Sequence, residues 1–501
     1  MTKALMGAPI AFFTFVAMLS AASLAISAGL IPNDTISLWA GAIIAGDGKF
    51  SLGHIIAAYP TIPFLATAAM QFIMPAGAPT PALLAGSLVA LLAAIWFVAF
   101  CSAGLSFPVA TLATALLVFH PALLQATIAG PAETLVAVFL YIFGTALFDL
   151  RARGAAPEVM LVSFALVGLA FSHPMGAAIA CAAVPYLVFA VSPTLVANSA
   201  FNVVLALVFP TVFSVGAFTY ISWVFPGSGW SFYSAPSQSL AAWATGVNDI
   251  FGGGLTGIRA LDAAFAFALA LALGAPLALI VGYEVRRRAP LLAPALVLAA
   301  TTVTAAAISG ATGWFGEPAA VAVAAPVLCA VMIVRIPEAR ADIGRMLGLL
   351  ALGWAGGALA LALVNPGVIV QFGGAGPRAD QERVAALNIG RVTLGRRGVL
   401  VDTDNAPAVV IGRGDAHGLL PPGDEAFTLA LQFGRLDTPF VAVPDPQSAT
   451  GAEDRIDRSF PSLYHHGAPG YRLIFENAVW RLYGREPGPA AKPAPSERQT
   501  P

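Results

Sequence analysis

Two carboxylates adjoin long apolar segments, where a charged side chain is costly. Asp34 lies in Ile31-Pro-Asn-Asp-Thr35, directly after the first apolar segment, and Glu133 opens a later one in Gly130-Pro-Ala-Glu133. Carboxylates in such places act as general bases or as ligands for a metal or a substrate. A structural role fits equally, because Asn-Asp-Thr is a good helix cap and the helix dipole favours an acid in the first turn. Both interpretations stay open for both residues.

Eight further side chains are candidates for substrate binding. Aromatic residues between the seventh and eighth apolar segments form either an interfacial belt or contacts to a sugar ring or an acyl chain. Arg259 either binds a lipid phosphate through charge-assisted hydrogen bonds or pairs with Asp249 or Asp262. The candidates are Asp47, His54, Tyr59, His120, Trp230, Tyr233, Asp249 and Arg259.

Other polar motifs are interpreted as structural. Asp402-Thr-Asp404 has the spacing of a metal-binding DxD motif, but it follows a predicted strand, so a strand-terminating turn is expected. The charged run 454–458 indicates a solvated helix face, and the pair at 465–466 is too isolated for a metal site. The three cysteines lie within apolar segments and indicate neither a disulfide nor a metal site.

The elements that position these residues are predicted to be membrane helices. The chain is 58% hydrophobic and 10% charged, whereas soluble domains carry about 25% charged residues. Of its 51 charged residues, 22 precede position 366 and 29 follow. This composition predicts a polytopic membrane protein, and the net charge of −1 argues against a nucleic-acid partner.

Eleven segments are near the length of about 20 residues that a bilayer requires. With a cytoplasmic N-terminus, nine basic residues fall inside and two fall outside, which is a strong positive-inside signal. Residues 54–75 are apolar but broken by Pro60 and Pro63, so we expect a juxtamembrane or re-entrant element in the first external loop. The eleven predicted spans are 8–30, 80–101, 105–120, 132–149, 158–173, 175–192, 202–224, 260–283, 290–309, 318–335 and 345–364.

The composition changes near Pro366 from apolar to that of a soluble domain. We therefore predict a membrane domain (1–365), a small α/β domain (366–488) and a disordered tail (489–501). Strands are predicted at 398–401, 408–411, 440–443 and 472–475, and helices at 380–387 and 424–431. An odd number of spans places this domain outside the cell membrane.

The arrangement of residues 1–365 resembles the GT-C superfamily of polytopic glycosyltransferases. The resemblance is carried by Asn33-Asp34 after the first helix, by Tyr59-Pro-Thr-Ile-Pro63, and by Pro131-Ala-Glu133 at a later helix start. It implies a mainly α, GT-C-like helical bundle that takes a sugar from a polyprenyl-phosphate carrier on the external face. Asp34 would then be the base, Glu133 a supporting acid and Arg259 the carrier-phosphate ligand. Such enzymes commonly have two acids after the first helix, and here Asp47 is the candidate for the second.

The expected function is transfer of the sugar to a lipid or glycan acceptor in a bacterial inner membrane, among membrane lipids and without nucleic acid. No cofactor is required, although the acids are compatible with a divalent metal such as Mg²⁺ or Mn²⁺. A lipid or polysaccharide transporter and a non-catalytic subunit of a glycan assembly complex are the alternatives. We count the lack of paired broken helices against the transporter.

Overall fold

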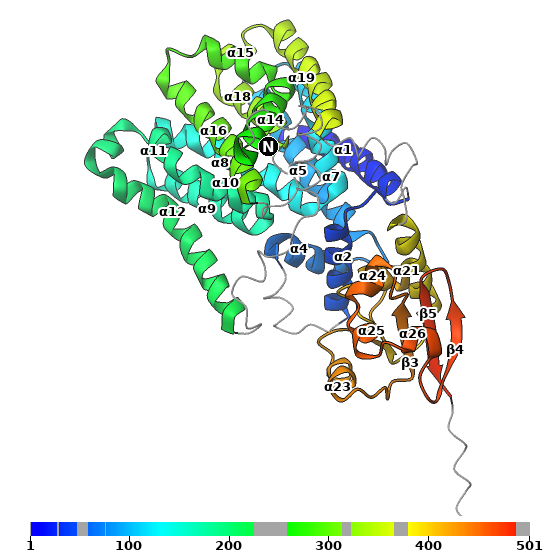
Figure 1. Cartoon of the computed structure of the whole chain (residues 1–501). Coiled ribbons are helices and arrows are strands. Elements are labelled where there is room, and N and C mark those ends of the chain that lie inside the picture. Colours follow the sequence, from blue (N-terminus) through cyan, green and yellow to red (C-terminus); the bar gives the residue numbers. More distant parts are fainter. Residues whose placement is uncertain are drawn as a thin grey trace, which may run out of the picture. The chain divides into compact units, whose positions relative to one another are not determined.

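The computed structural model describes residues 2–27, 30–47, 59–75, 77–224, 258–312, 322–364 and 379–486. The chain forms two compact units. The first unit comprises Met1–Thr35, Leu52–Ile73 and Pro79–Ala375, and the second comprises Ile36–Ser51, Met74–Ala78 and Gly376–Pro501. The described chain is mainly helical, as its composition predicts (Figure 1).

Apolar helices make up the first unit. α2 (Asn33–Gly46) starts in this unit and continues into the second. The other helices are α1 (Thr2–Ser27), α4 (Thr61–Ile73), α5 (Thr80–Ser102), α6 (Phe107–Val118), α7 (Pro121–Ala129), α8 (Pro131–Ala152), α9 (Ala156–Ser172), α10 (Pro174–Ala183), η1 (Val184–Tyr186), α11 (Leu187–Ala190), α12 (Pro193–Val224), α14 (Arg259–Gly274), α15 (Pro276–Glu284), α16 (Ala289–Thr312), α18 (Ala324–Arg335), η2 (Pro337–Arg340) and α19 (Ile343–Val364).

Six helices of the described chain are long and apolar enough to cross a membrane, and there are eight such spans if each of two bent helix pairs counts as one. The bends are 56° between α6 and α7 and 86° between α14 and α15. Four apolar stretches are shorter: α4, α9, α10 together with α11, and α18. The predicted multi-pass membrane protein is thus confirmed, while the number of eleven crossings stays a prediction.

Proline sets many of these helix starts. Each helix from α5 to α10 has a proline in its first two positions. Proline suits this place because the first amide of a helix has no intrahelical partner and the ring already holds a helical φ. The same preference breaks α6 from α7 at His120-Pro121 and α9 from α10 at His173-Pro174.

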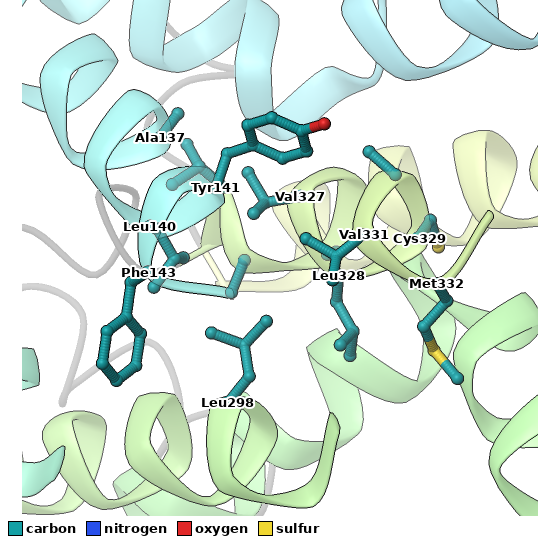
Figure 2. Packing of buried hydrophobic residues seen from close by; sticks show 14 of the residues in the cluster. Ala137, Leu140, Tyr141, Phe143, Leu298, Val327, Leu328, Cys329, Val331 and Met332 are labelled. Atoms are coloured by element: carbon teal, nitrogen blue, oxygen red, sulfur yellow. The ribbon is translucent and has the colours of Figure 1, made fainter. Parts of the chain in front are cut away.

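The core of the first unit is centred on α8, which packs against α5, α9, α16 and α18. Leu140 and Phe143 of α8 are fully buried beside Leu298 of α16 and Val331 of α18 (Figure 2). Gly144 permits this close packing, because a Cβ at that position would lie 3.0 Å from both Leu298 and Val331. α8 is therefore firmly held along its length, which fixes the side chains at both of its ends.

Ion pairs gather at the C-terminal end of α8. Asp149 accepts two hydrogen bonds from Arg335 of α18, at 2.9 and 2.5 Å, and lies 3.0 Å from Arg153. Arg153 also lies 3.0 Å from Glu158, in the first turn of α9. These contacts join the end of α8, the start of α9 and the end of α18 through permanent cations.

The second unit contains a five-stranded sheet in the order β2-β1-β3-β5-β4. β1 pairs in parallel with β2 and β3, whereas β5 pairs antiparallel with β3 and β4. Its strands are β1 (Val399–Leu400), β2 (Leu419–Leu420), β3 (Phe440–Pro444), β4 (Tyr471–Glu476) and β5 (Trp480–Arg485). Its further helices are α21 (Ala379–Thr393), α22 (Pro407–Arg413), α23 (Glu425–Phe433), α24 (Ala449–Glu453), α25 (Arg455–Ser459) and α26 (Leu463–His466).

Three predicted strands and both predicted helices of this unit are confirmed, as β1, β3, β4, α21 and α23. The strand predicted at 408–411 is wrong, because these residues belong to α22. Pro407 begins that helix and Gly414, in the left-handed region at φ 80°, ends it, so the end signals prevail over a β-branched sequence. The solvated face predicted at 454–458 is also wrong, since Asp454 and Asp457 are buried.

Candidate functional site

The start of α2 packs against the break between α7 and α8. The Thr35 hydroxyl donates a hydrogen bond to the carbonyl oxygen of Ala129. Gly130 follows with φ 142°, and a Cβ there would lie only 2.7 Å from Thr35 Oγ1. A glycine is required here both by this positive φ and by the lack of space for a Cβ. The structure thus brings the segment that holds Asp34 against the turn that leads into Glu133, although 94 residues separate Thr35 from Ala129.

Glu133 is buried in the first turn of α8, with 7% of its surface exposed. Its Oε1 lies 3.7 Å from His173 Nε2. The helix dipole favours an acid in this position, as the structural interpretation predicts. The neighbouring imidazole is a neutral hydrogen-bonding group rather than a permanent cation. Glu133 therefore faces a histidine as well as beginning a helix.

His173, which the sequence did not single out as a site residue, has a defined orientation. It caps α10, and its Nδ1 accepts a hydrogen bond from the Met175 amide at 3.0 Å. An acceptor nitrogen carries no hydrogen, so the hydrogen of the neutral ring is on Nε2, the atom that faces Glu133. The sequence signal is the dipeptide His173-Pro174, in which a histidine precedes the proline that begins a helix.

Tyr59 joins this region from the segment before α4. Its hydroxyl donates to the carbonyl oxygen of Ala170 at 2.9 Å, near the C-terminal end of α9. Its ring lies 6.4 Å from that of Phe218, which in turn is 5.5 Å from Phe171. Ala170 is three residues before His173, so Tyr59 is bound to the same helix end that leads into the Glu133–His173 pair.

Asp34 combines an exposed side chain with a raised pKa. It is in the first turn of α2 and its side chain is exposed. The surrounding atoms nevertheless desolvate the carboxyl group and raise its pKa above the ordinary value. A raised pKa increases the basicity of a carboxylate, which suits removal of a hydroxyl proton.

His120 occupies a different place, at the bend between α6 and α7. Its Nδ1 accepts from the Ala122 amide at 3.3 Å, so Nε2 carries the hydrogen and donates to the carbonyl oxygen of Gly353, at 3.2 Å. A Cβ at Gly357 would lie 2.6 Å from the ring. Both nitrogens are thus engaged: Nδ1 caps α7 and Nε2 fastens it to α19. The nine residues of α7 separate this site from Gly130, a length of about 14 Å.

The remaining candidates lie elsewhere in the chain. Asp47 belongs to the second unit, just past the end of α2. The backbone of Arg259 forms the first residue of α14, and its side chain lies outside the described residues, as does all of loop 225–257. The candidates that therefore have no described position are His54, Trp230, Tyr233 and Asp249.

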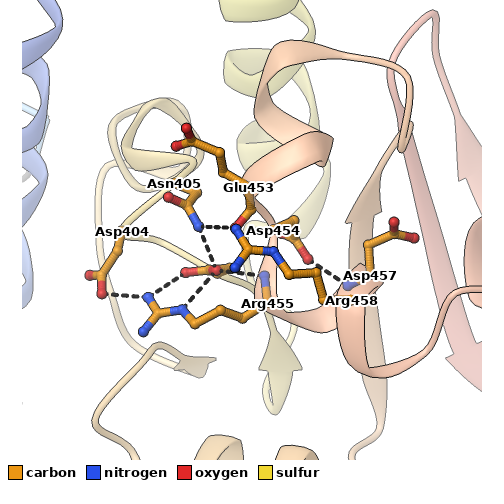
Figure 3. A network of polar contacts seen from close by, with 8 residues as sticks. Asp404, Asn405, Glu453, Asp454, Arg455, Asp457 and Arg458 are labelled. Atoms are coloured by element: carbon orange, nitrogen blue, oxygen red, sulfur yellow. Dashed lines mark hydrogen bonds and ion pairs between the residues drawn. The ribbon is translucent and has the colours of Figure 1, made fainter.

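The predicted turn after β1 is confirmed, and a network of charges surrounds it (Figure 3). Arg455 donates to Asp402 at 2.8 and 3.0 Å and to Asp404 at 2.5 Å. Burial by itself would raise the pKa of Asp402, but the hydrogen bonds and charge of Arg455 and a bond from Asn405 lower it overall. This acid is held ionised by an arginine that cannot lose its proton, so the motif stabilises the domain.

The first unit thus brings together the start of α2, the start of α8, the α9–α10 junction and the segment before α4. These four segments contribute Asp34, Glu133, His173 and Tyr59 to one end of the helical unit. Two carboxylates, an imidazole and a phenol thus come from neighbouring segments, and the Tyr59 ring lies beside the rings of Phe218 and Phe171. No family model matches the chain, and no curated protein matches it.

Proposed function

We propose that the protein is an integral-membrane glycosyltransferase that moves a sugar from a polyprenyl-phosphate carrier to a lipid or glycan acceptor on the external face. The observation that supports this most directly is the contact of Thr35 with Ala129, which joins the Asp34 and Glu133 segments. The resemblance to the GT-C superfamily supplies the reaction class, and the proton-accepting groups at the end of a membrane bundle suit that class.

The proposed reaction needs one base and one good leaving group. Asp34 removes the proton of the acceptor hydroxyl while its oxygen bonds to the anomeric carbon of the donor. The bond from that carbon to the carrier oxygen breaks, and the polyprenyl phosphate leaves with the electron pair. Because phosphate is already a good leaving group, a single carboxylate is chemically sufficient. Glu133 and His173 orient the acceptor, and Arg259 is proposed to bind the carrier phosphate.

We infer eleven crossings by adding three of the shorter helices, or helix pairs, to the eight candidate spans. α9 runs the full length of α8, because Glu158 meets Arg153 at one end and His173 meets Glu133 at the other. α10 and α11 return along α8, since Val191 after α11 accepts a hydrogen bond from Arg151.

α18 ends at the same place, where Arg335 binds Asp149. Arginines gather at this end, so we assign it to the cytoplasm of a bacterial inner membrane and the second unit to the external side.

Replacement of Asp34 by asparagine tests the proposed base. Asparagine remains a good residue for a helix start, so a purely structural Asp34 tolerates the change. Cells that lack the gene are complemented with wild type, Asp34→Asn or Asp424→Asn, and envelope glycolipids and glycans are profiled by mass spectrometry. Asp424 caps α23 and receives the same chemical change far along the chain. We expect Asp424→Asn to restore the products and Asp34→Asn to fail at equal protein amounts. Restored products with Asp34→Asn would refute the proposed base.

A transporter is the second candidate, and one observation favours it. Paired broken helices, whose expected lack counted against transport, are present as α6–α7 and α14–α15. A buried histidine, His120, lies at the first of these bends. Discontinuous helices are typical of transporter binding sites.

Detergent micelles separate the two functions, because they have no second compartment. Purified protein is incubated in micelles with a panel of short-chain polyprenyl-phosphate hexoses and an extract of membrane lipids. Formation of a glycosylated lipid that depends on Asp34 supports the enzyme. If no donor is consumed in micelles while vesicles containing the protein translocate the same lipids, the protein is a transporter.

A further inference from the structure

A group of possible metal ligands lies in the second unit, whereas the proposed catalytic residues belong to the first. It is formed by Asp47, just past the end of α2, and by Asp415 and His417 in the loop between α22 and β2. Their ligand atoms all lie within 4.8 Å of one another, and Asp47 Oδ1 is 3.1 Å from His417 Nδ1. Among the residues that the structure describes, this is the one group with such geometry.

The position of Asp47 calls for positive charge. It follows the last turn of α2, where its amide bonds to the carbonyl oxygen of Ile43. The exposed carbonyl groups at a helix C-terminus carry partial negative charge, so a carboxylate there is repelled and a cation is favoured. In the structure Asp47 accepts a hydrogen bond from the Ala416 amide and approaches His417. The 415–417 loop is thus already bound to this helix end.

The loop is held by a buried arginine. Arg413 donates to the carbonyl oxygens of Thr393, Arg396 and His417, and its Nε donates to Asp415 at 2.7 Å. Only 6% of Arg413 is exposed. In metal sites, residues that do not bind the metal themselves typically hold the ligand side chains by hydrogen bonds. Ligands that are already held lose less conformational freedom when the metal binds. Asp415 keeps a second oxygen for a metal while its first is held by Arg413.

The donor set indicates the class of ion. One imidazole nitrogen with two carboxylates suits first-row divalent transition metals, whereas Mg²⁺ prefers oxygen ligands alone. Two donors on a tetrahedral ion with bonds of about 2.0–2.2 Å are separated by about 3.3–3.6 Å, close to the observed 3.1 Å between Asp47 and His417. The His417 side chain is 75% exposed, which leaves room for water to complete the coordination.

We propose that Asp47, Asp415 and His417 bind one divalent transition-metal ion, of the Zn²⁺ class, at the end of α2. Small rotations of the side chains bring all three donors to one ion. The bound metal joins the end of α2 to the 415–417 loop. The proposal is independent of glycosyl transfer, because it concerns binding by residues that have no part in the reaction described above.

Calorimetry with the full-length protein in detergent tests this site. The protein is purified through a tag without histidine and titrated with Zn²⁺, with and without excess Mg²⁺. Wild type is expected to bind one Zn²⁺ that Mg²⁺ does not displace, and His417→Ala to weaken binding at least about tenfold. His466→Ala is the matched control, because His466 is also exposed but lies in α26 beside another histidine.

Two further measurements separate lost ligation from lost folding. Zn²⁺ should raise the melting temperature of wild type and of His466→Ala, but not that of His417→Ala. Without metal, the three proteins should melt at similar temperatures, because the mutated side chains are exposed. The site is refuted if His417→Ala binds Zn²⁺ as wild type does, if wild type shows no saturable binding, or if His466→Ala abolishes it.

Discussion

The two ends of α8 each place a buried glutamate beside a basic residue, and the two basic residues differ in kind. Glu133 begins α8 and Glu158 begins α9 at the opposite end, and each is 7% exposed. Glu158 lies 3.0 Å from Arg153, which keeps its charge at every physiological pH. Glu133 lies 3.7 Å from His173, which does not.

The comparison shows why burial and helix dipole cannot identify a catalytic acid by themselves. Both glutamates follow a proline and gain from the helix dipole, so the structural interpretation applies to both. Only the partner differs. A permanent cation holds a carboxylate ionised and fastens two helices, whereas a histidine is not a permanent cation. We therefore propose a stabilising role for the Glu158 end and a part in the reaction for the Glu133 end.

The largest expected effect is the loss of activity on replacement of Glu133 by glutamine. The change keeps shape and burial but removes the charge that we propose orients the acceptor, so product formation should fall by about 10²-fold. Glu158→Gln, the same change at the other end, should leave the rate per folded molecule within about threefold, because it contacts no substrate. Initial rates in micelles, normalised to folded protein, provide the measurement. Equal losses in both variants would remove the distinction between the two ends.

Stability should show the opposite order. Asp149→Asn leaves Arg335 without its two-bond carboxylate partner at the ionic end. Removing one partner of a largely buried ion pair lowers the free energy of unfolding by up to about 3–5 kcal/mol. Arg335 is partly exposed, so we expect a loss of about 2–4 kcal/mol here. Glu133→Gln should cost less than about 1 kcal/mol, since it keeps the volume and a hydrogen-bonding group. Unfolding in mixed micelles measures both, and a more severe loss for Glu133→Gln would contradict the assignment.

A backbone change sharpens the comparison at the Glu133 end. Gly130→Ala places a Cβ against Thr35 at a φ of 142° that only glycine adopts readily. The strain should destabilise the protein by about 1–3 kcal/mol and move the start of α2 away from α8. Activity should fall further than stability predicts, because Asp34 moves with Thr35. Gly104→Ala is the control, since it also has positive φ (100°) but open space around its Cβ position. Similar activity per folded molecule for the two variants would show that the Thr35 contact does not position Asp34.

The smallest expected effect concerns two acids of the second unit. Asp402 is paired with the permanent cation Arg455, whereas Asp454 is buried. Burial raises the pKa of Asp454 to about 7, and the negative charges of Asp402 and Asp457 add to the increase. Hydrogen bonds to its carboxylate from the Asp457 and Ile456 amides lower the pKa but do not outweigh burial. The folded protein therefore retains a proton that the unfolded chain loses above pH 3.8, so Asp454 reduces stability as pH rises from about 4 to about 7.

Asp454→Asn removes this titration, and asparagine still caps α25. The variant should therefore be more stable than wild type at pH 8, by on the order of 1 kcal/mol, while the two proteins should have similar stability at pH 4. Hydrogen exchange of peptides from α25, compared between the two proteins at each pH, is the measurement. A difference that does not grow with pH would show that Asp454 is not the titrating group.

Much of the fold could be predicted because its signals are local. Helix length and hydropathy identify the spans, and prolines such as Pro131 and Pro174 mark helix starts. Where two local signals conflict, prediction failed. In α22 the valines favour a strand, while Pro407 and Gly414 at its ends favour a helix, and burial of the helix against α21 settles the outcome.

The candidate site was predicted only in part, because partners are set by contacts between distant segments. Asp34, Glu133 and Tyr59 could be named as candidates from their types and places, whereas His173 was not singled out. Its role depends on Nε2 facing Glu133, 40 residues earlier in the chain. Asp47 was grouped with the substrate-binding candidates, whereas folding places it beside His417 in the second unit.

The sequence by itself determined that this protein is a membrane protein of many helices with a more charged C-terminal region, because lipid and water select for composition along every segment. Only the tertiary structure decided which basic side chain accompanies each buried acid. That choice depends on close contacts between residues remote in sequence, such as Glu133 with His173 and Asp149 with Arg335. Such contacts follow from how helices pack against one another rather than from any local pattern.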